Sequence, residues 1–134
     1  MRISKEYRLL EDGETVTLGD LKITSLLVPG HTLGHTAYLI NDRLLFTGDS
    51  LAINETGGYC FFDIFNQDSD LNKKSLAHLG ERMAGYDLKA VFTSHNGWTE
   101  DVKGAFAHVN TIPVISKANP FDKTAPYDCF EEQE

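Results

Sequence analysis

The sequence predicts a fold of the α/β (α+β) class, with one mixed or antiparallel sheet and two main helices. Short apolar segments with strand character occupy most of residues 13–47 and return at residues 88–93. Two later segments place apolar residues at helical spacing instead. Polar side chains follow the ends of several apolar strands, and α/β proteins gather distant residues into one site in this way.

Two strands are expected before residue 29. Residues 13–19 alternate apolar and polar side chains between two glycines, which indicates a brief strand. Residues 21–28 continue as a second strand. Pro29 ends this strand because proline has no backbone N–H to donate to a sheet ladder, so the residues beyond it lie in a loop.

A hairpin is expected next. Residues 36–40 and 43–47 are strand-like runs separated by Asn41 and Asp42, and both of these residues are suited to a tight turn. Residues 50–68 are less regular and contain an aromatic run at 59–65.

The first helix is expected to begin near residues 68–70, where two aspartates and a serine supply capping oxygens and negative charge. Leu76, Leu79 and Met83 recur at helical spacing, and Gly85 marks the end of the helix.

A second helix is expected after the strand at residues 88–93. Thr99 or Asp101 caps its start, and it ends before Pro113. Its apolar face comprises Val102, Phe106 and Val109.

Length and composition bound the class of protein. The 134 residues fit one domain, which we divide into an N-terminal extension (1–12), a central domain (13–112) and an irregular acidic arm (113–134). The net charge of −8 argues against a nucleic-acid partner, because phosphate binding needs a basic surface. No apolar run approaches the roughly 20 residues that span a bilayer. Residues 1–6 are too polar for a signal peptide, so we expect a cytoplasmic protein with no membrane partner.

Three motifs place potential metal ligands after apolar strands. They are Pro-Gly-His-Thr-Leu-Gly at 29–34, Phe-Thr-Gly-Asp at 46–49 and His-Asn-Gly at 95–97. Taken singly, His31 is a loop histidine, Asp49 a turn residue and His95 a polar strand end. Taken together they indicate a metal site, because zinc binds both imidazole nitrogen and carboxylate oxygen.

In order and spacing, these motifs resemble those of the metallo-β-lactamase superfamily, over residues 13–110. The resemblance implies half of an αββα sandwich, with both helices on one face of its sheet. It also implies that His31, Asp49 and His95 are metal ligands and that Asp49, as the catalytic carboxylate, bridges two zinc ions. Hydroxide held by the metals would then attack an ester, thioester or lactone. Iron or manganese would suit the same ligands.

The first ligand motif of that superfamily, His-x-His-x-Asp-His, does not occur in the 134 residues. We therefore expect the C-terminal half of a metal-dependent hydrolase, which in isolation is inactive and holds one zinc ion or none. An isolated half would expose an apolar sheet face, so a homodimer or a separate N-terminal half is expected, besides a small-molecule substrate. The alternative is a non-catalytic, self-associating module with a remnant metal site.

Further residues near the motifs have two interpretations each. His35, Thr32 and Trp98 are candidates for a second layer around the metals or for a pocket wall, and core packing would equally explain Trp98. The resemblance implies that residues 59–65 approach the mouth of the site and face substrate. Their other interpretation is a core plug beneath a long loop.

The remaining histidines and the cysteines are not expected at the site. His78 and His108 fall off the apolar stripes of their helices and are expected on the surface. Cys60 and Cys129 are expected to be free thiols, with a disulfide between them as the alternative. No base is expected near Cys60, so we do not predict a thiol nucleophile.

Overall fold

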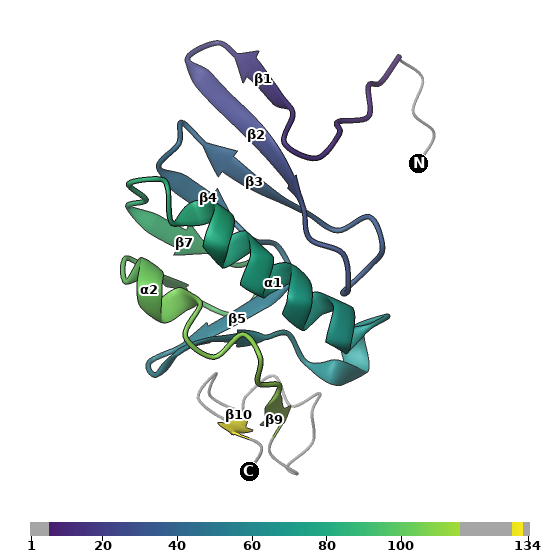
Figure 1. The fold of residues 1–134 in the computed structure, drawn as a ribbon, viewed down its shortest axis with the longest axis vertical. Helices are drawn as coiled ribbons and strands as arrows, with labels where there is room; N and C mark the ends of the chain where they lie inside the picture. Colours follow the sequence, from purple (N-terminus) through teal and green to yellow (C-terminus); the bar gives the residue numbers. More distant parts are fainter. Residues whose placement is uncertain (1–5, 116–129, 133–134) are drawn as a thin grey trace.

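The computed structural model describes residues 6–115 and 130–132 (Figure 1). The strands of its main sheet are β1 (Thr15–Leu18), β2 (Leu21–Leu27), β3 (Thr36–Ile40), β4 (Leu44–Phe46), β7 (Ala90–Phe92) and β8 (Trp98–Thr99). Two smaller sheets pair β5 (Leu51–Asn54) with β6 (Gly57–Cys60), and β9 (Pro113–Ile115) with β10 (Phe130–Glu132). The helical elements are η1 (Asp63–Phe65), α1 (Ser69–Met83) and α2 (Val102–Ala105).

The main sheet is mixed, as predicted. Its strand order is β1-β2-β3-β4-β7-β8. Neighbouring strands are antiparallel except β4 and β7, which run in parallel. The chain between β4 and β7 crosses over through the β5–β6 hairpin and α1, because parallel strands cannot be joined by a tight turn.

The predicted hairpin is confirmed between β3 and β4. Asn41 and Asp42 adopt φ angles of 53° and 57°. Positive φ at both central residues matches the twist of antiparallel strands, and asparagine and aspartate tolerate it better than most residues. The side chain of Asn41 also accepts a hydrogen bond of 2.8 Å from the backbone N–H of Lys22.

The predicted first helix is confirmed as α1. It begins after Asp68, whose carboxylate accepts a hydrogen bond of 2.9 Å from the backbone N–H of Leu71. Leu76, Leu79 and Met83 are buried, as their spacing predicts. Asn72 occupies the first position of the same buried stripe.

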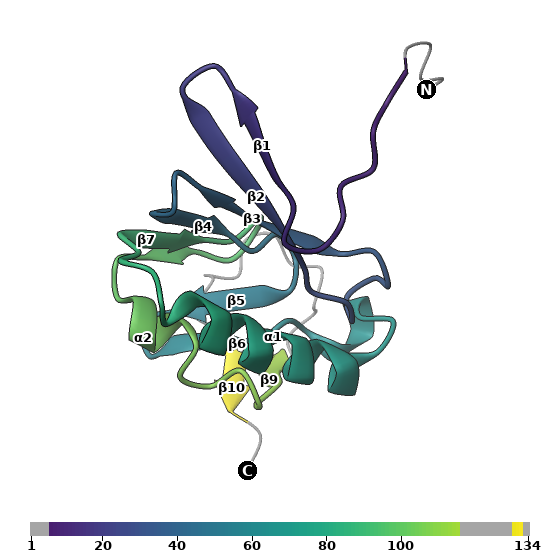
Figure 2. The ribbon, with the colours of Figure 1, turned by 45° about the horizontal axis from the view of Figure 1, so that its top comes forward.

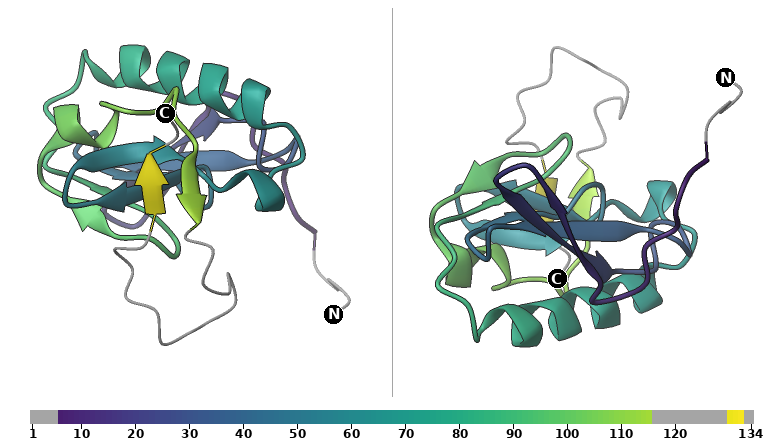
Figure 3. Two further views of the ribbon diagram at one scale, coloured as in Figure 1. Left: turned by 90° about the horizontal axis from the view of Figure 1, so that it is seen from below. Right: turned by 90° about the horizontal axis from the view of Figure 1, so that it is seen from above.

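The helices lie on one side of the main sheet (Figures 2 and 3). The core forms between α1 and the sheet face that carries Leu26, Leu39, Leu45 and Val91. No described helix is both long and apolar enough to cross a membrane.

The opposite face of the sheet carries an exposed row of aromatic side chains. Tyr38 pairs with Phe46, Phe46 with Phe92, and Phe92 with Trp98 on neighbouring strands. Directly opposed residues share a face, so the four rings follow one another across the sheet. Tyr38, Phe46 and Trp98 are 42%, 41% and 58% exposed. The ring centroids of Phe46 and Phe92 are 4.9 Å apart, and those of Phe92 and Trp98 are 5.7 Å apart.

The second helix is shorter than predicted. The helix was expected to extend through Val109, but α2 ends at Ala105. After α2 the chain pairs with β6 instead, and the N–H of His108 donates to the carbonyl oxygen of Gly58 at 3.0 Å. His108 is half-buried rather than fully solvated, because its ring stacks on Tyr59 with centroids 4.8 Å apart. His78 is exposed, as predicted.

Two further pairs of strands lie where none was predicted. β5 and β6 form a hairpin within the segment expected to be less regular. β9 and β10 pair within the segment expected to be an irregular arm, of which residues 116–129 and 133–134 lie outside the described residues. Cys60 is a buried free thiol, and Cys129 is among those residues outside the description.

A glycine substitution tests the packing between β6 and α2. A Cβ added to Gly58 would lie 1.8 Å from the carbonyl oxygen of Ala105. We expect Gly58→Ala to lower the free energy of unfolding by about 1–3 kcal/mol, because the backbones must separate. A Cβ on Gly85 meets no atom within 4 Å, so Gly85→Ala is the control and should change stability by less than about 0.5 kcal/mol. Equal urea midpoints for the two variants would contradict this packing.

Candidate metal centre

Strand direction brings the three motifs to one edge of the main sheet. β3 is antiparallel to both β2 and β4, and β4 is parallel to β7. β2, β4 and β7 therefore run the same way, and their carboxyl ends meet at one edge. His31, Asp49 and His95 each follow one of these ends.

The loop that carries His31 is held against the start of α1. The N–H groups of Gln67 and Asp68 donate to the carbonyl oxygens of His31 and Gly30, at 3.1 Å and 2.9 Å. Gly30 has a φ of 144°, and an added Cβ would lie 2.3 Å from the Cα of Asn72. Glycine is required here because the loop touches the helix backbone directly.

The turn that carries Asp49 is held from both sides. Its first residue, Thr47, is fully buried and donates from its N–H and its hydroxyl to the carbonyl oxygen of Phe92, at 2.9 Å and 3.1 Å. The carbonyl oxygen of Thr47 lies 2.8 Å from the hydroxyl of Ser50 and 2.9 Å from Nε2 of His35. These bonds hold the backbone of Thr47, two residues before Asp49, in place.

The loop that carries His95 is tied to the same turn. The N–H of Ser94 donates to the carbonyl oxygen of Gly48 at 3.0 Å. The carbonyl oxygen of Asn96 accepts from the N–H of Ile53 on β5, at 2.8 Å. The side chain of His95 is 68% exposed, whereas that of His31 is 18% exposed, so His95 lies at the open side of the site.

Asp49 lies between the two imidazoles. Its Oδ1 is 3.2 Å from Nε2 of His95, and its Oδ2 is 3.7 Å from Nε2 of His31. Oδ1 is buried and forms no hydrogen bond with a described residue. A buried carboxylate oxygen outside any hydrogen bond is unfavourable, and a cation beside it, either the imidazolium of His95 or a metal ion, would compensate it.

The tautomer of His31 supports the same conclusion. Its Nδ1 lies 3.2 Å from Oδ1 of Asn66, whose own amide nitrogen donates to Phe61 and Ser69. Asn66 Oδ1 is therefore an acceptor, so Nδ1 of His31 carries a proton, and in a neutral ring Nε2 is the nitrogen without one. Nε2 faces the carboxylate of Asp49, 3.7 Å from its Oδ2. A metal-binding histidine commonly donates its other N–H in this way, so the orientation of His31 is compatible with a zinc ligand.

The described residues do not form a closed cluster of ligands. Within residues 6–115 and 130–132, no group of three or more histidine, cysteine, aspartate or glutamate side chains is arranged to hold a metal ion. The arrangement consists instead of two histidine–aspartate contacts that share Asp49. Each contact supplies part of a ligand set, because structural and catalytic zinc sites need at least three protein ligands.

The structure separates the three residues predicted around the metals. His35 lies behind the site: its ring is perpendicular to that of His31 at 5.6 Å and bonds to Thr47. Thr32 closes the loop of His31 through its carbonyl oxygen, which accepts from Gly30 and His35, and its side chain is exposed. Neither residue is a metal ligand in this geometry.

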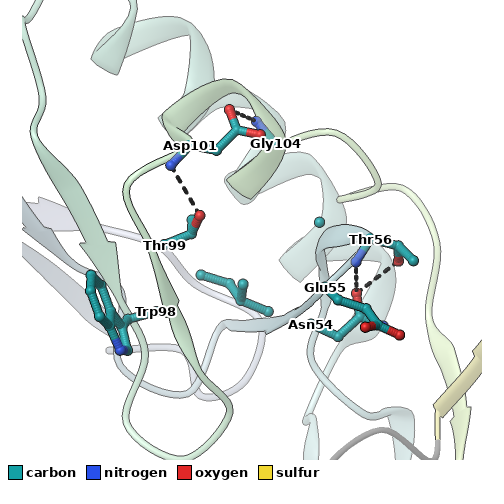
Figure 4. A pocket seen from close by; sticks show the side chains of 9 residues that line it. Asn54, Glu55, Thr56, Trp98, Thr99, Asp101 and Gly104 are labelled. Atoms are coloured by element: carbon teal, nitrogen blue, oxygen red, sulfur yellow. Dashed lines mark hydrogen bonds between the residues drawn. The ribbon is translucent and has the colours of Figure 1, made fainter.

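Trp98 lines a pocket, but its lining residues do not include the predicted ligands. The pocket has a volume of about 370 Å³ and lies between the β5–β6 turn and the segment from β8 to α2 (Figure 4). Asp101 faces it, but its carboxylate already accepts a hydrogen bond from the N–H of Gly104.

The aromatic run at residues 59–65 is part core plug and part exposed segment, so each of its two interpretations describes a part of it. Tyr59 and Phe61 are buried, and the Phe61 ring meets the edge of His31 at 5.4 Å. Ile64 and Phe65 are exposed instead. The first part is a core plug that supports His31, and only the second part is open to a ligand.

Two asparagines that contact the candidate site were missed. Asn66 orients His31, and Asn72 donates to the carbonyl oxygen of Ser50, directly after Asp49, at 2.9 Å. A signal was present for Asn72, because a polar residue occupies the apolar stripe of α1. Cys60 accepts a second contact from Asn72, at 3.1 Å, and burial raises the pKa of its thiol. Cys60 is thus a buried neutral group, consistent with the prediction that it is no nucleophile.

Segments of the chain are similar to curated hydrolases. One segment is 49% identical over 51 residues to the probable polyketide biosynthesis zinc-dependent hydrolase BaeB of Bacillus velezensis, covering 38% of this chain and 22% of that protein. Another comparison gives 44% identity over 55 residues with the hydroxyacylglutathione hydrolase of Dictyostelium discoideum, covering 36% and 20%. The matches thus span about a fifth of these relatives. No family model matches the sequence.

The fold is similar to that of an archaeal metallo-β-lactamase superfamily protein, ST1585 from Sulfolobus tokodaii. The TM-score is 0.53 at 24% identity, and the match covers 69% of this chain and 35% of that protein. The chain is therefore a partial α/β domain with the metallo-β-lactamase fold. Together with the hydrolase matches, this confirms the resemblance to the metallo-β-lactamase superfamily that the three motifs predicted.

A double-mutant cycle tests the support that His35 gives to the Asp49 turn. Gly48 has a φ of 63°, and an added Cβ would lie 2.7 Å from Cε1 of His35. We expect Gly48→Ala to lower the free energy of unfolding by about 2–3 kcal/mol, from backbone strain and displacement of the ring. In a His35→Ala background the same change should cost about 1 kcal/mol less, measured by urea unfolding of all four proteins. Strictly additive effects would contradict the contact.

Proposed function

We propose that this chain contributes His31, Asp49 and His95 to a zinc site of a metallo-β-lactamase-type hydrolase. In this proposal the chain is the C-terminal half of the catalytic domain, and the other ligands come from a His-x-His-x-Asp-His segment outside these 134 residues. The substrate is a small molecule with an ester, thioester or lactone bond. The observation that carries the proposal is the position of Asp49, which has an imidazole Nε2 beside each carboxylate oxygen.

The side chains have separate roles in this proposal. Asp49 and the two histidines hold zinc, and the unpaired Oδ1 of Asp49 supplies the negative charge that the cation meets. Asn66 accepts from Nδ1–H of His31, so that in the neutral imidazole Nε2 is the nitrogen available to a metal ion. When bound, zinc lowers the pKa of water toward neutrality and polarises a carbonyl group. The names of the curated relatives, a zinc-dependent hydrolase and a hydroxyacylglutathione hydrolase, support this class of reaction.

Metal content tests the ligand set. The purified chain, loaded with zinc and passed over a desalting column, should retain about one zinc ion per chain, measured by plasma mass spectrometry. Asp49→Ala and His95→Ala should abolish zinc retention. The first removes the carboxylate shared by both histidine–aspartate contacts, and the second removes one of the two imidazoles.

His78→Ala is the matched control for these variants. His78 is an exposed histidine on α1 and is not part of the candidate site, so its removal should leave the zinc content unchanged. Equal zinc content in the wild type, Asp49→Ala and His95→Ala would refute the proposed ligand set.

A second function is favoured by the aromatic row on the face of the main sheet that no described helix covers. Soluble proteins seldom leave adjacent large apolar side chains exposed unless a partner covers them. The alternative proposal is a non-catalytic module in which two copies of the chain cover this face of each other, with a remnant metal site. Phe46, flanked by Tyr38 and Phe92, lies within the row.

Sedimentation distinguishes the two functions. If self-association is the function, the metal-free chain should form a dimer, and Phe46→Lys should convert it to a monomer by placing a charge in the interface. Ile64→Lys, which alters an exposed apolar residue outside the row, should leave the dimer intact. Asp49→Ala should change neither the mass nor the melting temperature. A wild-type monomer at all concentrations would exclude this alternative.

A further inference from the structure

Asn72 is the polar exception in the buried stripe of α1. It has no exposed surface, and the other members of the stripe are Leu76, Leu79 and Met83. A residue at this position would ordinarily be apolar, because it faces the core. Its presence calls for a physical reason.

The two sides of Asn72 face the two loops of the candidate site. Its backbone touches the loop of His31, since a Cβ on Gly30 would lie 2.3–2.4 Å from the Cα, Cβ and N of Asn72. Its side-chain nitrogen donates to the carbonyl oxygen of Ser50, at 2.9 Å. Ser50 follows Asp49 directly, and its hydroxyl closes the same turn by bonding to Thr47. Asn72 therefore joins the loop of His31 to the loop of Asp49.

The side chain is only partly satisfied. Its nitrogen meets Ser50 and the sulfur of Cys60, at 2.9 Å and 3.1 Å, but its buried Oδ1 has no hydrogen-bond partner among the described residues. A buried amide with an unpaired oxygen is unfavourable to folding, so the fold alone does not account for an asparagine here.

We propose that Asn72 is a positioning residue, which sets the Asp49 turn against the His31 loop through its hydrogen bond to the Ser50 carbonyl. The inference rests on the proposed zinc site and adds a residue that does not touch the metal. Residues that orient ligands from behind commonly change metal affinity by 10–100-fold when replaced.

The sharpest test measures cobalt affinity and melting temperature together. Co²⁺ replaces zinc as a spectroscopic probe, and its visible absorption reports binding to the full chain without any substrate. Asn72→Leu removes the donor and the unpaired oxygen, so it should weaken cobalt binding by about tenfold or more while the melting temperature falls little. Asn72→Ala removes the same donor without added bulk and should weaken binding equally.

Two controls separate positioning from stability. Cys60→Ala removes the other partner of the Asn72 amide but leaves the bond to Ser50, and Leu76→Val loosens the same stripe one turn later. Both should lower the melting temperature and leave cobalt affinity within about threefold of the wild type. A purely structural Asn72 would instead place all four variants on one line relating affinity to melting temperature, and that result would overturn the inference.

Amide hydrogen exchange gives a readout that needs no metal. The N–H of Phe61 donates to the same Ser50 carbonyl oxygen as Asn72. If the loss of Asn72 makes this carbonyl more mobile, the N–H of Phe61 should exchange with solvent more readily. In Asn72→Leu the exchange of Ser50 and Phe61 should quicken at least tenfold, while that of the Leu39 and Leu45 amides in the sheet stays unchanged. Unchanged exchange at Ser50 and Phe61 would refute the role of Asn72. Failure of the wild-type chain to bind cobalt, with this local change intact, would instead refute the zinc site.

Discussion

The parallel pairing of β4 with β7 is the constraint on which the candidate site depends. Because β2 runs in the same direction, three loops that are distant in the sequence leave the sheet at one edge. An antiparallel β7 would carry His95 to the far edge, away from Asp49. The parallel pairing requires a crossover, and α1 is its longest element. The same helix then contacts the His31 loop, so one topological feature both gathers the ligands and supports them.

The polar groups of the core lie mainly behind the candidate site. Thr47, Ser50 and Asn72 are buried and hydrogen-bonded close to Asp49. Burial of such groups is unfavourable unless they are paired, and here their partners belong to the site's loops. The uncovered sheet face is different, with a row of aromatic rings and no described helix over it. An exposed aromatic row on one face of the main sheet fits a partial domain.

Local patterns made much of the fold predictable. Alternation, Asn41-Asp42 and the cap at Asp68 act within a few residues, so the strands, hairpin and first helix followed from them. The length of α2 could not be predicted in this way, because the chain leaves the helix so that His108 pairs with Gly58, 50 residues earlier in the sequence. The β5–β6 hairpin was missed for a related reason: Leu51, Ala52 and Ile53 are all buried, and a strand buried on both faces shows no alternation.

The order and spacing of the motifs predicted that His31, Asp49 and His95 lie together. They did not predict which residues hold these side chains in place. Asn66 and Asn72 act through tertiary contacts to His31 and Ser50, and of the two only Asn72 left a trace in the sequence, as a polar residue in the apolar stripe of α1. Trp98 follows His95 closely in the sequence, yet its ring stacks on Phe92 in the exposed aromatic row, and the pocket that it borders is not lined by His31, Asp49 or His95.

The most direct test of the zinc site is an anomalous difference map from crystals of this chain grown with zinc, recorded on both sides of the zinc absorption edge. The account predicts a peak within about 2.0–2.2 Å of an Asp49 oxygen and of Nε2 of His31 or His95. A map with no peak at these atoms, together with a hydrogen-bond donor from the protein on Asp49 Oδ1, would contradict it.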